Sequence, residues 1–62
     1  MAKLARFEFY PDTKGFWRFR LVASNGEVVG SGEGYRSQRD ARRGARALRL
    51  AALTARTVEG TN

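Results

Sequence analysis

Residues 16–29 read FWRFRLVASNGEVV, and the apolar residues on both sides of Asn25-Gly26 decide the fold. Before the turn, every second residue from Trp17 to Ala23 is apolar, as on the buried face of a strand. Asn-Gly is the strongest short signal for a two-residue hairpin turn, and such a turn fixes the register of its strands. The expected partners are Ala23 with Val28, Val22 with Val29, Leu21 with Gly30, and Phe19 with Gly32.

A second hairpin is expected before this one. Residues 4–10 alternate in the same way, PDTKG at 11–15 forms the turn, and Glu8 lies opposite Arg18 as a cross-strand ion pair. A five-residue loop pairs Tyr10 with Phe16, Phe9 with Trp17, Phe7 with Phe19, and Ala5 with Leu21. The two turns together predict one antiparallel three-stranded meander, whose core face holds Ala5, Phe7, Phe9, Trp17, Phe19, Leu21, Ala23 and Val28.

A helix is expected to begin at SQRD, residues 37–40. Ser37 can cap a backbone N–H there, and Asp40 can reach back in a capping box. At the helical period, one side carries mostly small residues that let the helix lie close over the aromatic sheet face: Ala41, Gly44, Ala45, Leu48, Ala51 and Ala52. The other side carries arginines: Arg39, Arg42, Arg43, Arg46 and Arg49.

The end of the helix predicts a partner chain. Its last turns are apolar nearly all round, and residues 55–58 are compatible with a strand but too short to stand alone. A chain of 62 residues without cysteine or histidine has no disulfide and no usual zinc ligand to support a marginal core. We therefore expect an α+β fold of order β-β-β-α with a final short strand. We also expect a homodimer whose interface contains Leu50, Leu53, Ala55, Thr57 and Val58.

Four segments occur in a characteristic order: FEFY at 7–10, GFWRFRL at 15–21, NGEVV at 25–29 and SGEGYRS at 31–37, followed by Ala41 and Gly44. Over about residues 7–44, this series resembles the YegP-like family of small bacterial and archaeal proteins. The resemblance implies a β-β-β-α-β unit that occurs either as tandem repeats or as a homodimer, with two units forming one sheet and exchanging their C-terminal strands. Because residues 1–62 hold one such domain, the homodimer is implied. The stretch ARALRLAAL at 45–53 departs from the family pattern. The resemblance brings no established activity, catalytic residue or cofactor.

The charge predicts attraction to polyanions, because 12 Lys and Arg against 6 Asp and Glu give a formal charge of +6. Two faces are candidates for binding nucleic acid. On the outer sheet face, basic and aromatic residues mix in the way that single strands favour: Arg6, Arg18 and Arg20 with Tyr10 and Phe16. On the helix, a stripe could follow phosphates: Arg39, Arg42, Arg43 and Arg46. The alternative for both faces is ordinary ion pairing and solvation.

The glycine-rich stretch GSGEG at 30–34 has two interpretations. Glycines before a helix N-terminus can hold an anion, and the candidate site consists of Gly32, Gly34, Arg36 and Ser37. The stretch matches no nucleotide-binding motif, however. In the other interpretation, Gly30 and Gly32 make room for the helix and the aromatic rings, and Gly34 allows the chain to reverse, with Tyr35 packing at the corner.

Nothing in the sequence indicates an enzyme, a metal site or a cofactor. Of the six carboxylates, only Glu33 has no expected structural role, and no histidine is present to activate a hydroxyl. No apolar run approaches the length of a membrane span, so we expect a cytoplasmic protein. The expected partners are a second copy of the chain and, in the alternative, nucleic acid or another polyanion.

Overall fold

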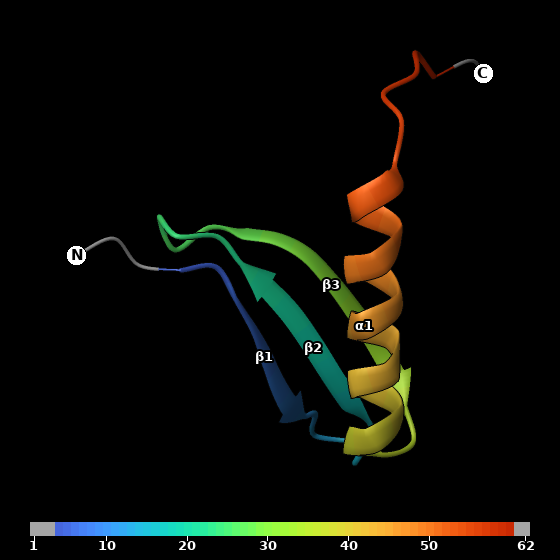
Figure 1. Cartoon of the computed structure of the whole chain (residues 1–62). Helices are drawn as coiled ribbons and strands as arrows, with labels where there is room; N and C mark the ends of the chain where they lie inside the picture. Colours follow the sequence, from blue (N-terminus) through green and yellow to red (C-terminus); the bar gives the residue numbers. More distant parts are fainter. Residues whose placement is uncertain (1–3, 61–62) are drawn as a thin grey trace.

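The computed structural model describes residues 4–60, and it contains one antiparallel sheet covered on one face by one helix. The strands are β1 (Arg6–Pro11), β2 (Trp17–Val22) and β3 (Val28–Tyr35), in the spatial order β1-β2-β3. The helix α1 (Gln38–Thr54) follows and crosses the sheet (Figure 1). The α+β class and the three-stranded meander with one helix are therefore confirmed.

The register predicted for the first hairpin is wrong by two residues. Phe9 lies opposite Phe19, and Glu8 lies opposite Arg20 instead of Arg18. The loop is shorter than expected, because the N–H of Asp12 donates to the carbonyl of Phe16 at 2.7 Å and Gly15 has φ 87°. A three-residue loop that ends in a left-handed glycine closes a hairpin well. A shift by two residues preserves the face of each side chain, so the apolar face survives the error.

The second hairpin agrees with the predicted register only in the middle of its strands, because register shifts occur between Trp17 and Phe19 and between Leu21 and Val22. Phe19 faces Gly32 and Leu21 faces Gly30, as expected. The turn contains three residues rather than two, since the N–H of Ala23 donates to the carbonyl of Glu27 at 2.8 Å. Val22 consequently faces Val28, so its predicted pairing with Val29 and that of Ala23 with Val28 are both wrong.

This irregularity changes which valines are buried. Val22, which is not among the predicted core residues, is only 3% exposed, while Val28, predicted for the core, is 56% exposed. An extra residue in one strand bends that strand and increases its twist. Here Val29 is the extra residue, between the pairs Leu21–Gly30 and Val22–Val28.

The core is small and aromatic. Phe19 is 3% exposed, and its ring lies 6.0 Å from that of Phe7, 6.3 Å from that of Phe9 and 5.8 Å from that of Tyr35. The helix reaches these rings because its central contact residues, Ala41 and Ala45, are small and fully buried. Other predicted core residues are only half-buried: Phe7, Phe9, Trp17, Leu21, Ala23 and Leu48.

The N-terminus of α1 is capped as predicted. Ser37 has an extended backbone, and its hydroxyl oxygen accepts a hydrogen bond from the N–H of Asp40 at 3.0 Å. The return bond of a capping box, from the Asp40 carboxylate to Ser37, is not among the hydrogen bonds of residues 4–60. A single cap is enough to begin the helix at Gln38.

The helix and the sheet diverge. Figure 1 shows them meeting near the start of α1, after which the strands turn away and the last helical turns have no sheet behind them. Ala51 and Ala52, predicted to face the sheet, are therefore exposed. Residues 55–60 form no strand within this single chain. No helix in the described part of the chain is long and apolar enough to cross a membrane.

Candidate functional site

The glycines of β3 make room for aromatic rings. A Cβ at Gly32 would collide with the Phe19 ring and lie 2.9 Å from the Tyr35 hydroxyl oxygen. A Cβ at Gly30 would lie 3.4 Å from a methyl group of Leu48. Gly34 has φ +80° and turns the chain so that Tyr35 packs at the corner. The structure thus gives Gly32 a space-making role and Gly34 a conformational one, whereas a Cβ at Gly30 would make about van der Waals contact and could be accommodated.

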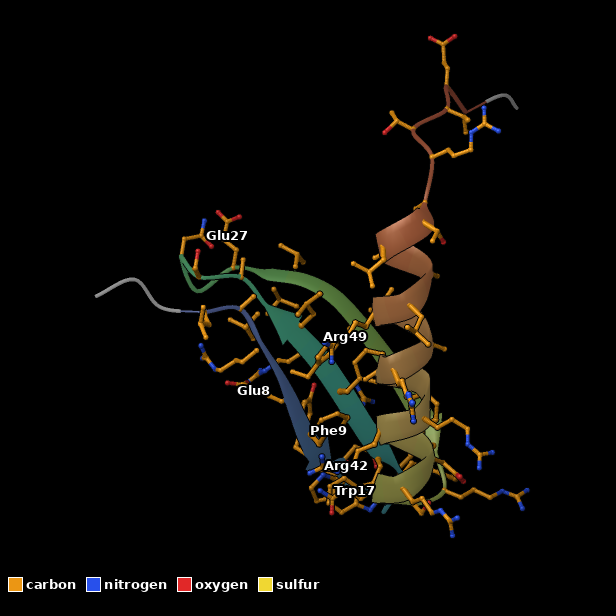
Figure 2. All side chains as sticks on the ribbon, viewed as in Figure 1. Glu8, Phe9, Trp17, Glu27, Arg42 and Arg49 are labelled. Carbon is orange, nitrogen blue, oxygen red and sulfur yellow. The ribbon has the colours of Figure 1, made fainter. Side chains whose placement is uncertain are left out.

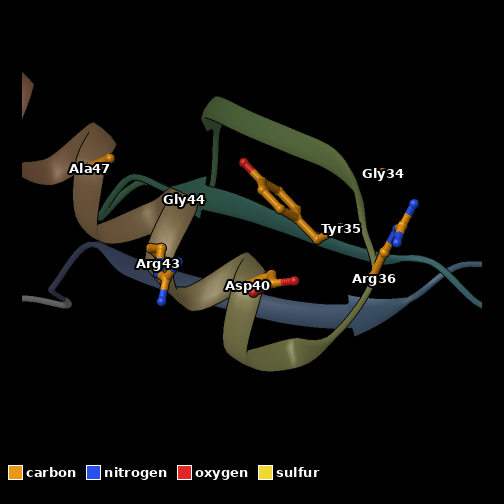
Figure 3. A pocket seen from close by; sticks show the side chains of 7 residues that line it. All are labelled: Gly34, Tyr35, Arg36, Asp40, Arg43, Gly44 and Ala47. Atoms are coloured by element: carbon orange, nitrogen blue, oxygen red, sulfur yellow. The ribbon is translucent and has the colours of Figure 1, made fainter.

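Gly44 of α1 completes this arrangement. A Cβ there would collide with the Tyr35 ring, so the ring occupies the space that Gly44 leaves on the helix (Figure 3). The sequence marked Gly44 only as one of several small residues on the helix. The pairing with Tyr35 was missed because it depends on where the helix lies on the sheet.

The candidate anion residues do not converge on one point. A shallow cavity of about 560 Å³ is lined by Gly34, Arg36, Asp40 and Arg43. Figure 3 shows Arg36 and Arg43 pointing away from each other, with the Asp40 carboxylate in the same region. Gly32 lies outside this lining, against the aromatic rings, and the oxygen of Ser37 already accepts the capping hydrogen bond.

The outer face of the sheet is an ion-pair network. Glu8 lies between two arginines, with its oxygens 2.6 Å from Nε of Arg20 and 2.7 Å from Nε of Arg6. The hydrogen bond from Arg20 lowers the pKa of Glu8, and that from Arg6 lowers it further. The predicted pair of Glu8 with Arg18 is wrong, because the register shift brings Arg20 to that place.

Arg18 is also paired on this face. Its guanidinium contacts Asp12 at 3.2 Å and Glu33 at 3.5 Å. Burial acts to raise the pKa of Asp12, but hydrogen bonds from Arg18 and from the backbone N–H groups of Lys14 and Phe16 outweigh it and lower that pKa. The hydrogen bond with Asp12 in turn raises the pKa of Arg18.

These pairs leave little free basic character on the sheet. The three arginines of the outer face contact three carboxylates, and Arg20 additionally lies 5.2 Å from the centre of the Tyr10 ring. Glu33, the carboxylate without an expected role, is one of these partners. The face predicted to stack single-stranded nucleic acid is thus occupied by its own ion pairs.

Arginines of α1 form a second basic surface, here called the arginine cluster. Its members surround a cavity of about 230 Å³ and are Arg39, Arg42, Arg43 and Arg46. All are exposed, and none of them forms an ion pair with a carboxylate among residues 4–60. The cluster does not point wholly away from the sheet as predicted, because the guanidinium of Arg42 lies 4.7 Å from the centre of the Phe9 ring (Figure 2).

A third feature is an apolar cleft where the helix leaves the sheet. It has a volume of about 400 Å³ and is lined by Ala5, Arg6, Phe7, Leu21, Arg49, Ala52 and Leu53. All five predicted interface residues are exposed in the single chain; Leu50 is 56% exposed, and Leu53 and Val58 are each 75% exposed. The sequence did not identify the β1 side of this cleft. The lengths of the elements could have indicated the cleft. The 17-residue helix is about 25 Å long and a six-residue strand about 20 Å, so the helix is longer than β1 and β2.

Within residues 4–60, no group of three or more acidic, histidine or cysteine side chains lies close enough together to hold a metal ion. The carboxylates of the sheet are engaged with arginines, and Asp12 also accepts hydrogen bonds from the N–H groups of its own turn.

Comparison with known proteins gives the family. A family model described as "Domain of unknown function (DUF1508)" matches residues 12–59. A UPF0339 protein of Treponema denticola is 43% identical over 54 residues, which cover 87% of this chain and 93% of that protein. UPF0339 protein NMB1088 of Neisseria meningitidis serogroup B is 50% identical over 34 residues, and that match spans 55% of this chain and 61% of the relative's length.

A solved structure confirms the fold. The NMR solution structure of a protein from Haloferax volcanii superposes with a TM-score of 0.79 at 34% sequence identity, covering 94% of this chain and 98% of that one. The chain therefore belongs to the DUF1508 family, the UPF0339 proteins of bacteria and archaea, to which the YegP-like resemblance pointed.

Proposed function

We propose that this protein is a single-domain, non-enzymatic module that works as a homodimer. A second copy covers the apolar cleft and the end of α1, and residues 55–58 of each chain add a strand to the partner's sheet. The observation that carries the proposal is the cleft with Leu53 at its rim, left open by the divergence of helix and sheet.

The surface area of the single chain supports a partner. The chain exposes 5590 Å², whereas a compact monomer of 6.9 kDa exposes about 4000 Å². Its radius of gyration is 13.4 Å, against about 10.6 Å for a compact domain of this length. A typical stable interface buries about 800 Å² on each partner, so the excess surface is large enough for one.

A second copy fits this surface better than an unrelated partner does. Leu50 and Leu53 lie on the same helix that forms one wall of the cleft, so two copies related by a two-fold axis could cover each other's apolar residues. In the order β1-β2-β3, both β1 and β3 have an unpaired edge. The extended segment after Thr54 could pair with one of these edges in the partner.

The proposed lack of enzymatic activity is supported by the engagement of the carboxylates. Glu8, Asp12 and Glu33 all contact arginines on the outer sheet face. A general base needs a free, positioned group near a bound substrate, and ion-paired carboxylates are poor candidates for that role.

Sedimentation equilibrium tests the dimer directly. We expect the wild-type mass to be twice 6.9 kDa at micromolar concentration, and Leu53→Asp to shift the protein toward the monomer, because a carboxylate would be buried in an apolar interface. Ala47→Asp is the matched control, since Ala47 is exposed on the same helix but lines a different cavity. A wild-type monomer at all concentrations, or equal effects of the two substitutions, would contradict the proposal.

A further inference from the structure

We propose that the arginine cluster of α1 binds the phosphate backbone of double-stranded nucleic acid. The cluster consists of Arg39, Arg42, Arg43 and Arg46, and the structure separates it from the ion-paired sheet face. This site lies on the first half of the helix and does not depend on the dimer, whose proposed contacts begin near Leu50.

The first observation in favour of this site is that positive charge is concentrated on the helix. Helix α1 contains five arginines and one aspartate, a formal charge of +4 on 17 residues. The arginines of the sheet are matched by Glu8, Asp12 and Glu33, so the excess positive charge of the described chain lies mainly on the helix. A charge excess on one face attracts a polyanion to that face.

The position of the arginines within the helix is the second step. A helix is stabilised by cations near its C-terminus and by anions near its N-terminus. Here Arg39 lies in the first turn beside Asp40, the cluster fills the first half, and the last turn has no basic residue. This order is unfavourable for the isolated helix, and a bound row of phosphates would compensate it.

Geometry favours a regular phosphate backbone. The four arginines follow the spacing i, i+3, i+4 and i+7, which places them on one face over about 10 Å of helix axis. A nucleic-acid duplex carries about one negative charge per 1.7 Å of its axis, so several phosphates lie within that reach. Arg42 is already positioned by the Phe9 ring, so less conformational freedom is lost when it binds.

The aromatic residues favour a duplex over a single strand. Single strands bind by stacking their bases on exposed rings. The Phe9 ring beside the cluster is half-buried and covered by Arg42, while the Tyr10 ring on the opposite face is covered by Arg20. The cluster thus offers exposed guanidinium groups for phosphates, whereas the nearest rings, Phe7 and Phe9, are half-buried.

Fluorescence anisotropy with a labelled 16-base-pair DNA duplex, measured over a series of salt concentrations, tests the proposal. Four phosphate contacts predict a slope of log K against log [salt] of about −3.6. The double variant Arg43→Ala and Arg46→Ala should reduce the slope to about −1.8 and weaken binding about 30-fold at 0.15 M salt. Alanine favours the helix, so this variant should fold.

A matched control removes the same charge from the sheet. The double variant Arg18→Ala and Arg20→Ala also lowers the net charge by two, lies outside the apolar cleft, and should keep the wild-type slope. Equal losses in the two double variants would show that only net charge matters and would overturn the site. Single-stranded DNA binding as tightly as the duplex, or tighter binding of poly-glutamate or of phosphatidylserine vesicles, would overturn the assignment to a duplex.

Discussion

At the scale of single residues, the packing of the helix against the sheet depends on two glycines, whose lack of a side chain leaves space for an aromatic ring. Tyr35 lies at the corner between β3 and α1, and its ring occupies the space above Gly32 and beside Gly44. The ring also packs 5.8 Å from Phe19, the most buried aromatic residue. The two glycines and the tyrosine therefore set how closely the helix approaches the sheet.

Substitution of Gly44 by alanine tests this contact, because the sign of the change in stability depends on whether the contact is present. Alanine is favoured over glycine in a helix by about 1 kcal/mol, so Gly44→Ala would stabilise α1 if nothing contacted it. Because the new Cβ would collide with the Tyr35 ring, we expect a net loss of about 1–2 kcal/mol and a decrease of about 5–15 °C in Tm.

Two controls accompany thermal denaturation of this variant. Gly60→Ala, whose Cβ would meet nothing within 4 Å, should leave Tm unchanged. In a Tyr35→Leu background the ring is absent, so Gly44→Ala should become neutral or stabilising. A stabilising Gly44→Ala in the wild-type background would show that Tyr35 moves aside freely.

At the scale of elements, the two hairpin turns decide the pairing of side chains. Both loops contain three residues and end in a glycine with positive φ, Gly15 in the first and Gly26 in the second. In the first hairpin, Asp12 accepts hydrogen bonds from the N–H groups of Lys14 and Phe16, which closes the loop early. This closure brings Arg20 rather than Arg18 to Glu8.

The ion pairs that join β1 and β2 predict a dependence of stability on pH. Because the folded protein lowers the pKa of Glu8 below 4.5, the ionised carboxylate stabilises the fold above about pH 4.5. This stabilising contribution is lost as the pH falls through the lowered pKa that Glu8 has in the folded protein. We expect the urea midpoint of wild type to decrease between pH 6 and pH 3, and Glu8→Gln to have a lower midpoint at pH 6 with a smaller further decrease.

The control for this titration is Glu27→Gln, an exposed residue of the second turn that makes no ion pair within residues 4–60 (Figure 2). This variant should keep the wild-type decrease with pH. A Glu8→Gln profile parallel to that of wild type would show that the ion pairs contribute no net stability, as many exposed pairs do.

At the scale of the whole molecule, the divergence of helix and sheet separates two surfaces. The first half of α1 covers the aromatic core and carries the arginine cluster, while the second half borders the apolar cleft. The proposed dimer contact and the proposed nucleic-acid contact therefore use different parts of one helix. Both can operate in the same molecule.

The proposed dimer predicts a melting temperature that depends on protein concentration. Mass action favours the associated, folded state at higher concentration, and for two chains of 62 residues Tm should rise by about 5 °C per tenfold increase. Calorimetry over a hundredfold range of concentration measures this rise. A constant Tm across that range, together with reversible unfolding, would indicate a monomer.

The sequence by itself determined the three strands, the helix and most of their faces, but not which valine beside the second turn is buried. Alternation of apolar residues, two turns and a capped helix are local signals, and they identified three strands, one helix, the space-making role of Gly32 and the conformational role of Gly34. The register was only partly predictable, because loop length depends on hydrogen bonds such as those of Asp12. The apolar face of the first hairpin was still predicted correctly, because a shift by two residues leaves each side chain on the same face of the sheet.

Only the tertiary structure decided which surfaces are open. The sequence treated the arginines of sheet and helix alike, and their pairing depends on carboxylates from neighbouring strands, such as Glu8 beside Arg20 and Glu33 beside Arg18. The cleft likewise depends on the angle between helix and sheet, to which Tyr35 and Gly44 contribute through packing. Contacts between residues distant in sequence follow from the relative placement of whole elements, which no local pattern encodes.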